Sequence, residues 1–389
     1  MLTLLKPFQG FFSRWKFDPA TAFVTVVIAP LGILLLKALA KHTKIWFIYL
    51  VDGVLYWLSR VVLHSLAARL TLRKYCSILL DGENRYLHVP SQHDIKLSVD
   101  TIFVTLHLEH HGGEKEAYTH GDLLELSNRV RVMGDPGSGK TSLAKRILRD
   151  QCRLALTSPS KARLPVFMEL KTLNIPASVK DKALGRWLLD HIRSIVTSVA
   201  VYKIQECFDA YCKTSGLLLL LDGLDEVSKS QYPRVSRAIQ ALSDDLAAES
   251  KDNAIVLTMR TQFYQQIKDE FRDAVGQAVF VRPFTPTDIF EFLSRWPFKA
   301  NKHSLIPQIY SDLTDRPTLR EMCSNPLILA MYVAEYETSD SPLAPESRTE
   351  FYNRVTEELV IKRRLKQTGK TPAPSKLREQ RERILVSCL

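Results

Sequence analysis

The feature that most constrains this chain is a glycine-rich loop placed between a strand pattern and a helix pattern. Gly134–Thr141 reads GDPGSGKT, which has the spacing GxxxxGK[ST]. The segment VRVM (130–133) before it predicts a buried strand, and Leu143, Ile147 and Leu148 recur after it at helical spacing. A simple glycine turn before a helix would not account for the Lys-Thr pair. The pattern therefore predicts a phosphate-binding loop at a helix N-terminus.

The residue types in this loop fit the chemistry of a nucleoside triphosphate. Glycines permit positive φ and a close approach of the backbone, whose N–H groups then bind phosphate oxygens. Lys140 is expected to reach the β- and γ-phosphates, and Thr141 to offer its hydroxyl to Mg²⁺. The predicted nucleotide-binding residues here are Gly134, Asp135, Pro136, Gly137, Ser138, Gly139, Lys140, Thr141 and Ser142.

A second motif combines five consecutive leucines with acidic residues. Leu217–Leu221 leads directly into Asp222, and the acidic pair Asp225 and Glu226 follows. Such a leucine run suits a central parallel strand covered on both faces, and ligands bind at the C-terminal ends of strands in open α/β sheets. Asp222 is thus expected to serve Mg²⁺ together with Thr141. Asp225 and Glu226 are both candidates to orient or deprotonate the attacking water, and the sequence does not rank them.

The alternation of strand and helix patterns predicts an α/β fold: a parallel five-stranded sheet between helices, followed by a helical subdomain. The predicted regions are 1–75, hydrophobic helices; 76–128, a β-rich linker region; 129–285, the P-loop domain; and 286–389, the helical subdomain. In the linker region, Tyr86–Val89 and Ile102–Leu106 have strand patterns. Its histidines match no standard metal-ligand spacing, and we predict a solvated loop there.

The N-terminal region contains a candidate membrane segment. Pro19–Leu36 is an uncharged run of 18 residues, the lower limit for a spanning helix, and the apolar stretch Ile45–Leu58 follows. We expect membrane contact through residues 19–66, by one span or two, with the P-loop domain cytoplasmic at an inner or plasma membrane. A soluble hydrophobic helix bundle is one alternative. A cleaved signal peptide is the other, although its leader would be overlong.

The positive charge of the chain lies at its two ends. The formal net charge is +11, but residues 1–75 contain 10 Lys or Arg against 2 Asp, and residues 362–383 contain 9 against 2 Glu. The remainder is net acidic, so nucleic acid is not expected at the core. The basic ends suit solvated tails, anionic lipid or an acidic partner. Six scattered cysteines without a CxxC spacing are typical of a reducing compartment.

These motifs resemble those of the NACHT NTPases, a family of the STAND class that includes animal NOD-like receptors and bacterial antiphage proteins. The resemblance runs from about residue 123 to about 364. It is carried by the two motifs above, by the small Gly223 after Asp222, and by the segments LPVFMELKTL (164–173), AIVLTMR (254–260), VRPFTPTDIFEFL (281–293), NPL (325–327) and FYNRVTEELVIKRR (351–364). It implies ATP and ADP as ligands, Arg260 near the γ-phosphate and Pro326 near the adenine.

The resemblance also implies a molecular switch of low turnover. ATP would favour an open state that forms homo-oligomers, and ADP a closed one. We therefore expect a membrane-anchored signalling ATPase of bacterial type, in antiphage or innate defence. A remodelling ATPase acting on protein or nucleic acid is one alternative, and a scaffold that binds nucleotide without hydrolysis is another. The winged-helix and repeat regions typical of the family do not follow, so we expect a fragment or a short member.

Overall fold

The computed structural model describes residues 64–89, 95–110, 118–267, 276–298 and 304–338. The chain divides into two compact units, Met1–Thr71 and Leu72–Leu389. In the first unit, the described residues are the start of helix α5 (His64–Asp81). Among the described helices, none combines the length and the apolar character needed to cross a membrane. Residues 19–63 of the predicted membrane segment lie outside the described ranges.

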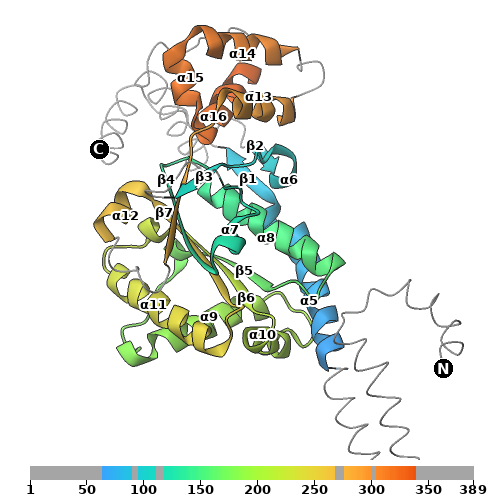
Figure 1. The fold of residues 1–389 in the computed structure, drawn as a ribbon, viewed down its shortest axis with the longest axis vertical. Coiled ribbons are helices and arrows are strands. Elements are labelled where there is room, and N and C mark those ends of the chain that lie inside the picture. The colour runs from blue at the N-terminus through green and yellow to red at the C-terminus, as the bar shows by residue number, and fades with distance from the viewer. Residues whose placement is uncertain (1–63, 90–94, 111–117, 268–275, 299–303, 339–389) are drawn as a thin grey trace, which may run out of the picture. The chain divides into compact units, whose positions relative to one another are not determined.

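The second unit is built around a mostly parallel sheet (Figure 1). Within the described residues this sheet has six strands in the order β3-β8-β4-β7-β6-β5. The strands are β3 (Leu108–His110), β4 (Arg129–Gly134), β5 (Leu164–Glu169), β6 (Leu217–Asp222), β7 (Ala254–Arg260) and β8 (Gln277–Val281). All neighbours run parallel except β3, which pairs antiparallel with β8.

The predicted parallel α/β sheet is therefore confirmed, but the predicted strand number was wrong. The five parallel strands are present, and β3 adds a sixth at the edge. Only Leu108 of this three-residue strand is buried, while Glu109 and His110 are exposed. Such a short edge strand gives no alternating pattern that the sequence could reveal.

The strand order explains how distant motifs meet. Strand β7 lies between β4 and β6, so the C-terminal ends of these three strands lie together at one edge of the sheet. All six residues of β6 are buried, as expected for a central strand covered on both faces. At the far edge, β5 contains Pro165, which donates no ladder hydrogen bond and is tolerated on an edge strand. Its carbonyl instead accepts from the Tyr75 hydroxyl at 3.0 Å.

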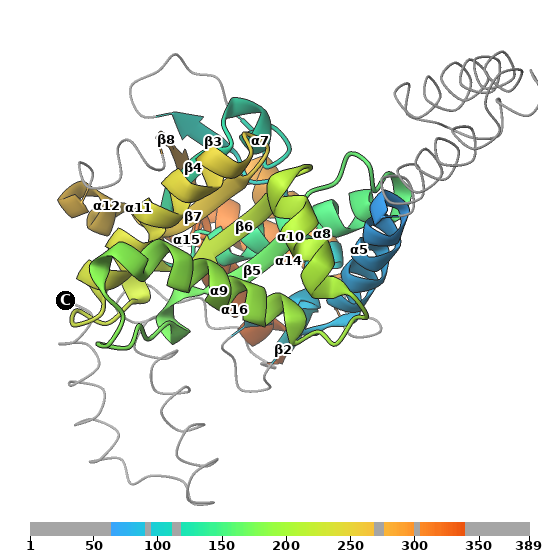
Figure 2. The ribbon, with the colours of Figure 1, turned by 90° about the horizontal axis from the view of Figure 1, so that it is seen from below.

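Helices cover the sheet (Figures 1 and 2). Helix α8 (Lys140–Thr157) packs against strands β4 to β7 through an apolar face that includes Leu143, Ile147 and Leu148. Helix α9 (Leu184–Thr197) packs on β5 and lies beside α11 (Tyr232–Glu249), and α10 (Ile204–Lys213) packs on β6. The short helix α12 (Thr261–Ile267) follows β7.

The turn before β6 is held by one buried side chain. Asn253 is 1% exposed; its Nδ2 donates to the carbonyls of Cys212 and Leu246, and its Oδ1 accepts from the Leu217 N–H. Gly216, at φ +88°, lies so close to this loop that an added Cβ would meet the Asp252 carbonyl oxygen at 2.2 Å. The N-terminal end of β6 is therefore held in place, and this helps to set the position of Asp222 at its C-terminal end.

The region before β4 differs in part from the prediction. The hairpin of β1 (Tyr86–Val89) and β2 (Ile95–Ser98) includes the first predicted strand. The second, Ile102–Leu106, was wrong: helix α6 (Val99–Ile102) leads into an irregular segment up to β3. Its apolar side chains are buried by packing, without strand pairing, which is why they give a strand-like pattern. Helix α7 (Leu123–Leu126) then leads into β4.

Among the described residues, four helices follow β8 and gather at one end of the sheet (Figure 1). They are α13 (Pro286–Arg295), α14 (Leu305–Asp315), α15 (Pro317–Cys323) and α16 (Pro326–Thr338). Helix α13 begins at a capping box, in which the Thr285 side chain accepts from the Asp288 N–H and the Asp288 carboxylate accepts from the Thr285 N–H. We call these four helices the helical region.

Candidate functional site

The glycine-rich loop joins the end of β4 to the start of α8, as its pattern predicted. Gly137 and Gly139 have φ of +80° and +94°, values that side chains other than glycine rarely adopt. Gly134 has no room for a side chain, because an added Cβ would lie 2.4 Å from Ser138 Oγ. Ser138 Oγ is itself buried and has no hydrogen-bond partner among the described residues. The loop thus offers an unsatisfied hydroxyl and a helix N-terminus, both of which suit an anion.

Lys140 is the cation of this loop. Its Nζ donates to the carbonyl oxygens of Gly134 at 2.7 Å and Asp135 at 2.9 Å. Burial lowers the pKa of Lys140 from its ordinary value, and the nearby carboxylate of Asp225 opposes that shift. Among the described residues, the hydrogen-bond acceptors of this ammonium are these two loop carbonyls, which bind it more weakly than an anionic oxygen would.

Asp222, at the end of β6, accepts from two threonine hydroxyls. Thr141 Oγ1 donates to its Oδ2 at 2.8 Å, and Thr258 Oγ1, from β7, donates to its Oδ1 at 2.6 Å. The Gly223 N–H in turn donates to Thr258 Oγ1 at 2.9 Å. Asp222 is 8% exposed, and these hydrogen bonds fix its carboxylate beside the Thr141 hydroxyl. A hydroxyl and a carboxylate side by side are the hard oxygen ligands that Mg²⁺ prefers.

This pair would be only part of a magnesium site. Among the described residues, no group of three or more His, Cys, Asp or Glu side chains is placed to hold a metal. Mg²⁺ in nucleotide sites is commonly held by one or two protein oxygens together with phosphate oxygens and water. Thr141 and Asp222 therefore fit a metal that arrives with the nucleotide.

The two acidic candidates that follow Asp222 differ in their contacts. Asp225 lies in the short 3₁₀ turn Leu224–Glu226 and binds Arg260, at the end of β7, in two ways. Its Oδ2 lies 2.8 Å from Arg260 Nε, and its Oδ1 accepts from the Arg260 N–H at 3.0 Å. Glu226 is exposed, and among the described residues its side chain has no hydrogen-bond or ion-pair partner. Asp225 is thus committed to Arg260, and Glu226 is the carboxylate left to face a ligand.

These groups line one cavity of about 520 Å³ with two chemically different ends. The polar end contains Lys140, Thr141, Asp222, Asp225, Glu226, Thr258 and Arg260. The other end, here called the apolar end, is lined mainly by the β1–β2 hairpin, the segment 102–106, and residues of α13 and α16: Leu87, Val89, Leu97, Ile102, Phe103, Val104, Leu106, Phe292, Pro326, Leu327 and Ala330. Two polar residues also line the cavity, His88 of the hairpin and Lys145 of α8, whose Nζ donates to the Tyr86 carbonyl at 2.9 Å. A cavity that is charged at one end and apolar at the other suits a nucleotide, with phosphates and base at opposite ends.

The helical region contacts the glycine-rich loop directly. Asn325 Nδ2 donates to the Pro136 carbonyl at 2.7 Å, and the Leu327 N–H donates to the Gly137 carbonyl at 3.2 Å. An added Cβ on Gly137 would lie 2.6 Å from Asn325 Oδ1. The start of α16 is therefore packed against the loop that would hold the phosphates.

Comparison with known protein families finds a match that covers most of the α/β sheet and the glycine-rich loop. Residues 128–300 match the model of the NACHT domain. This part of the chain is a P-loop NTPase domain, which binds and hydrolyses nucleoside triphosphate. No curated protein matches the chain.

Several solved structures show distant likenesses to this chain. A single-residue variant of Thermotoga maritima RuvB is 15% identical over 62% of this chain and 73% of that one, with a TM-score of 0.29. A Walker-type ATPase of Pyrococcus abyssi is 13% identical over 68% and 73%, with a TM-score of 0.36. The Orc1 protein of Aeropyrum pernix, solved in complex with DNA, is 13% identical over 67% and 72%, with a TM-score of 0.33. At such low TM-scores, nothing about function follows from these likenesses.

The cavity extends beyond the matched NACHT domain. The predicted residues that line it are Pro136, Gly137, Gly139, Lys140, Thr141, Ser142, Asp222, Asp225, Glu226, Arg260 and Pro326. Gly134 and Asp135 lie behind them and hold Lys140 through their carbonyls. The apolar wall before residue 128 and the start of α16 both fall outside the match, so the NACHT domain alone supplies the polar end but only part of the apolar one.

Sequence reasoning missed several residues of this site. Thr258 is a single hydroxyl within the apolar strand β7, a pattern that could have marked it as a polar group facing the site. Asn325 precedes a proline at a helix start, which is the signature of an N-cap. No signal in the sequence shows that the segment 102–106 forms a wall of the cavity, because that depends on long-range packing.

Proposed function

We propose that this chain is an ATP-driven switch of low turnover, in which the nucleotide controls the position of the helical region relative to the NACHT domain. The observation that carries this proposal is the pair of hydrogen bonds from Asn325 and Leu327 to the carbonyls of the phosphate-binding loop. A nucleotide in the cavity would contact the loop and the start of α16 together. Its affinity would then differ between positions of the helical region, which is what a switch requires.

The polar end supplies the means to distinguish ATP from ADP. Lys140 would exchange its bonds to loop carbonyls for bonds to β- and γ-phosphate oxygens, and the helix N-terminus favours the same charge. Arg260 lies at the end of β7 and is half exposed, so its guanidinium can donate to a γ-phosphate oxygen while Asp225 holds its Nε. Thr141 and Asp222 would hold Mg²⁺, which would neutralise phosphate charge.

Hydrolysis requires a carboxylate that orients the attacking water. We assign this role to Glu226, because the carboxylate of Asp225 is occupied by Arg260. The proton from the water would pass to the Glu226 carboxylate, and Asp225 would keep Arg260 oriented.

We further propose that ATP promotes homo-oligomerisation and that residues 19–66 anchor the chain at an inner or plasma membrane, with the NTPase domain on the cytoplasmic side. The uncharged run of 18 residues at 19–36 supports the anchor. The resemblance to bacterial antiphage and animal NOD-like proteins supports a role in defence. Fractionation checks the anchor: the full chain should remain in the membrane pellet after alkaline carbonate extraction, and recovery in the supernatant would exclude it.

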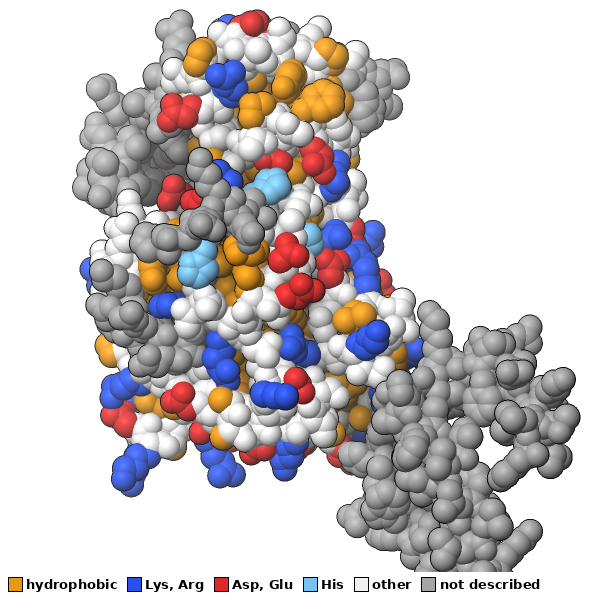
Figure 3. All heavy atoms as spheres, viewed as in Figure 1, with side chains coloured by type: hydrophobic (Ala, Val, Ile, Leu, Met, Phe, Trp, Pro, Cys, Tyr) orange, Lys and Arg blue, Asp and Glu red, His pale blue; other side chains and the backbone are white. Residues whose placement is uncertain are grey.

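The remodelling ATPase is the competing function. It would need an arginine that reaches a neighbouring subunit, but Arg282 pairs with Glu109 and Arg295 with Glu291. On the face shown in Figure 3, acidic and basic side chains are interspersed over the α/β body instead of forming one basic surface. Neither observation favours a nucleic-acid substrate.

The mass of the full chain in detergent, measured with ATP or ADP, tests the switch. We expect the Glu226→Gln variant to form a larger assembly with ATP than with ADP, because ATP would persist. The Lys140→Ala variant should show one mass in both. If the mass never changes, and hydrolysis is fast and stimulated by DNA, RNA or unfolded protein, the remodelling function replaces the switch.

A further inference from the structure

The segment 102–106 forms one wall of the apolar end of the cavity. Ile102, Phe103, Val104 and Leu106 line it, and Leu106 Cδ1 lies 3.2 Å from the point where a Cβ on Gly139 would lie. Leu106 of this wall therefore packs against the phosphate-binding loop. It belongs to no strand, so sheet hydrogen bonds do not set its position. Something else must hold it at a fixed distance from helix α8.

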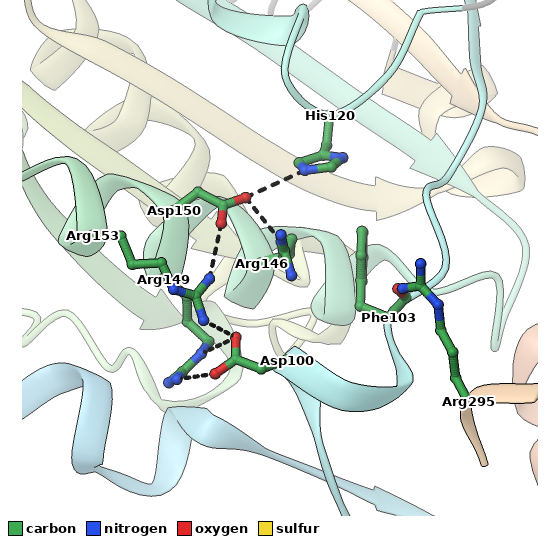
Figure 4. Close-up of polar contacts among 8 residues, drawn as sticks. All are labelled: Asp100, Phe103, His120, Arg146, Arg149, Asp150, Arg153 and Arg295. Atoms are coloured by element: carbon green, nitrogen blue, oxygen red, sulfur yellow. Dashed lines mark hydrogen bonds and ion pairs between the residues drawn. The ribbon is translucent and has the colours of Figure 1, made fainter.

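Arginines of helix α8 hold this wall from outside the cavity (Figure 4). Asp100, in helix α6, accepts from Arg149 Nε at 2.8 Å and also from Arg149 Nη2 and Arg153 Nη2. Arg149 is only 4% exposed, and its Nη1 donates to the Leu80 carbonyl at 2.8 Å. The pairing of Arg149 with Asp100 is bidentate, so it fixes the relative orientation of the two side chains as well as their distance. The start of the wall is thus fastened to the helix that begins at Lys140.

Phe103 connects the wall to two further parts of the molecule. Its ring lies 5.2 Å from the His120 ring, edge to face, and 5.5 Å from Arg146 Cζ. Asp150 holds these two neighbours in place: it accepts from Arg146 Nε at 2.9 Å and lies 3.3 Å from His120 Nε2. The carbonyl of Phe103 accepts from Arg295 Nη1, at the end of helix α13 (Figure 4). The wall is therefore held by α8 on one side and by the helical region on the other.

We propose that Asp100 and Arg295 are positioning residues for the nucleotide base: they set the distance of the 102–106 wall from helix α8 and so determine the affinity for the base, but not for the phosphates. Neither residue is among the side chains that line the cavity. Both act through the backbone of the wall. This inference rests on the proposed binding of ATP in this cavity, and adds that the helical region can alter base affinity through Arg295.

The comparison of ATP with inorganic tripolyphosphate separates base from phosphate binding. Tripolyphosphate with Mg²⁺ occupies only the polar end, whereas ATP uses both ends. Binding would be measured by calorimetry on the full chain in detergent. In Asp100→Asn, we expect a Kd for ATP about tenfold higher and a Kd for tripolyphosphate that changes less than about twofold. A defect in folding alone would lower the active fraction for both ligands equally, and would leave the ratio of the two Kd values unchanged.

A second variant keeps the test decisive if Asp100→Asn does not fold, since Arg149 would then be a buried charge without its partner. Arg295 is partly exposed, and Arg295→Gln should also raise the Kd for ATP, by about threefold, with tripolyphosphate unaffected.

Two matched controls test whether the effect is local. Glu291→Gln removes the ion pair to Arg295 but leaves the bond from Arg295 to Phe103, and Asp190→Asn removes an aspartate from a similar arginine pair on helix α9. Both should keep the wild-type ratio of the two Kd values.

The outcomes distinguish a failure of the positioning role from a failure of the nucleotide site itself. If both Kd values change together in Asp100→Asn and Arg295→Gln, or if neither changes, the positioning role is wrong. If the wild type binds neither ligand, or if Lys140→Ala still binds both as the wild type does, the proposed nucleotide site itself fails. The positioning role is supported only when tripolyphosphate binding persists and ATP binding weakens.

Discussion

Asn325 joins the helical region to the phosphate-binding loop, and its two side-chain functions can be separated by substitution. Its Oδ1 accepts from the backbone N–H groups of Leu327 at 3.1 Å and Ile328 at 3.4 Å, which caps helix α16. Its Nδ2 donates to the Pro136 carbonyl at 2.7 Å. Loss of an Asn cap costs about 1 kcal/mol of stability, and loss of a single hydrogen bond costs about 1 kcal/mol as well.

Asn325→Ala removes both functions and should lower the free energy of unfolding by about 2 kcal/mol. Asn325→Asp keeps the cap, and its charge suits a helix N-terminus, so it should cost only about 1 kcal/mol. For nucleotide affinity the order should reverse. The aspartate carboxylate would lie beside the Pro136 carbonyl and near the bound phosphates, whereas alanine adds no charge there.

Urea unfolding of the full chain in detergent would measure stability, and calorimetry would measure the Kd for ATP. The two variants should rank in opposite order in the two measurements: Asn325→Ala is the less stable variant, and Asn325→Asp binds ATP more weakly. If aspartate lowers stability more than alanine, the capping role is wrong. If neither variant alters ATP binding, the contact between α16 and the loop does not take part in the switch.

Three further predictions follow from individual contacts. Gly137→Ala should weaken ATP binding at least tenfold, because φ is +80° and the new Cβ would clash with the start of α16, costing about 1–3 kcal/mol. Gly121→Ala, whose Cβ has space, is the control, and equal losses of ATP binding in both variants would contradict this prediction. Asp225→Asn should lower kcat by about tenfold with a smaller change in the Kd for ATP, as expected for loss of one charge-assisted bond to Arg260. Steady-state ATPase assays and calorimetry would measure both, and an unchanged kcat would exclude a role of Asp225 in orienting Arg260. The hydrogen bond from Arg149 lowers the pKa of Asp100 from 3.8 to about 2, so its carboxylate adds stability above about pH 4 that is lost as the pH falls towards 2. The unfolding free energies of the wild type and Asp100→Asn should therefore differ near neutral pH and converge near pH 2. A difference that stays constant with pH would contradict this assignment.

The polar end of the site was readable from the sequence because each of its motifs is local. The glycine-rich loop carries its own spacing, and the leucine run ending at Asp222 marks a buried strand and its C-terminal end. Once the strands are parallel, their C-terminal ends meet at one edge, and Lys140, Asp222 and Arg260 come together. Local pattern and sheet topology are sufficient for this half.

The apolar end was not readable, for a physical reason. Its wall is an irregular segment whose apolar residues resemble a strand, and its position depends on Asp100, Arg149 and Arg295, which are far apart in the sequence. The sequence likewise does not distinguish Asp225 from Glu226, and the contact of Asp225 with Arg260 is what distinguishes their surroundings. Both features depend on contacts between distant residues, which no spacing rule encodes.

The most direct test of the account is ATP binding and hydrolysis by the full chain in detergent, with Mg²⁺, for wild type, Lys140→Ala and Glu226→Gln. The account predicts that the wild type binds and slowly hydrolyses ATP, and that Lys140→Ala loses binding. Glu226→Gln should bind ATP with a Kd close to that of the wild type but lose hydrolysis by about 100-fold or more. Hydrolysis by Glu226→Gln at the wild-type rate, or ATP binding by Lys140→Ala as tight as that of the wild type, would contradict it.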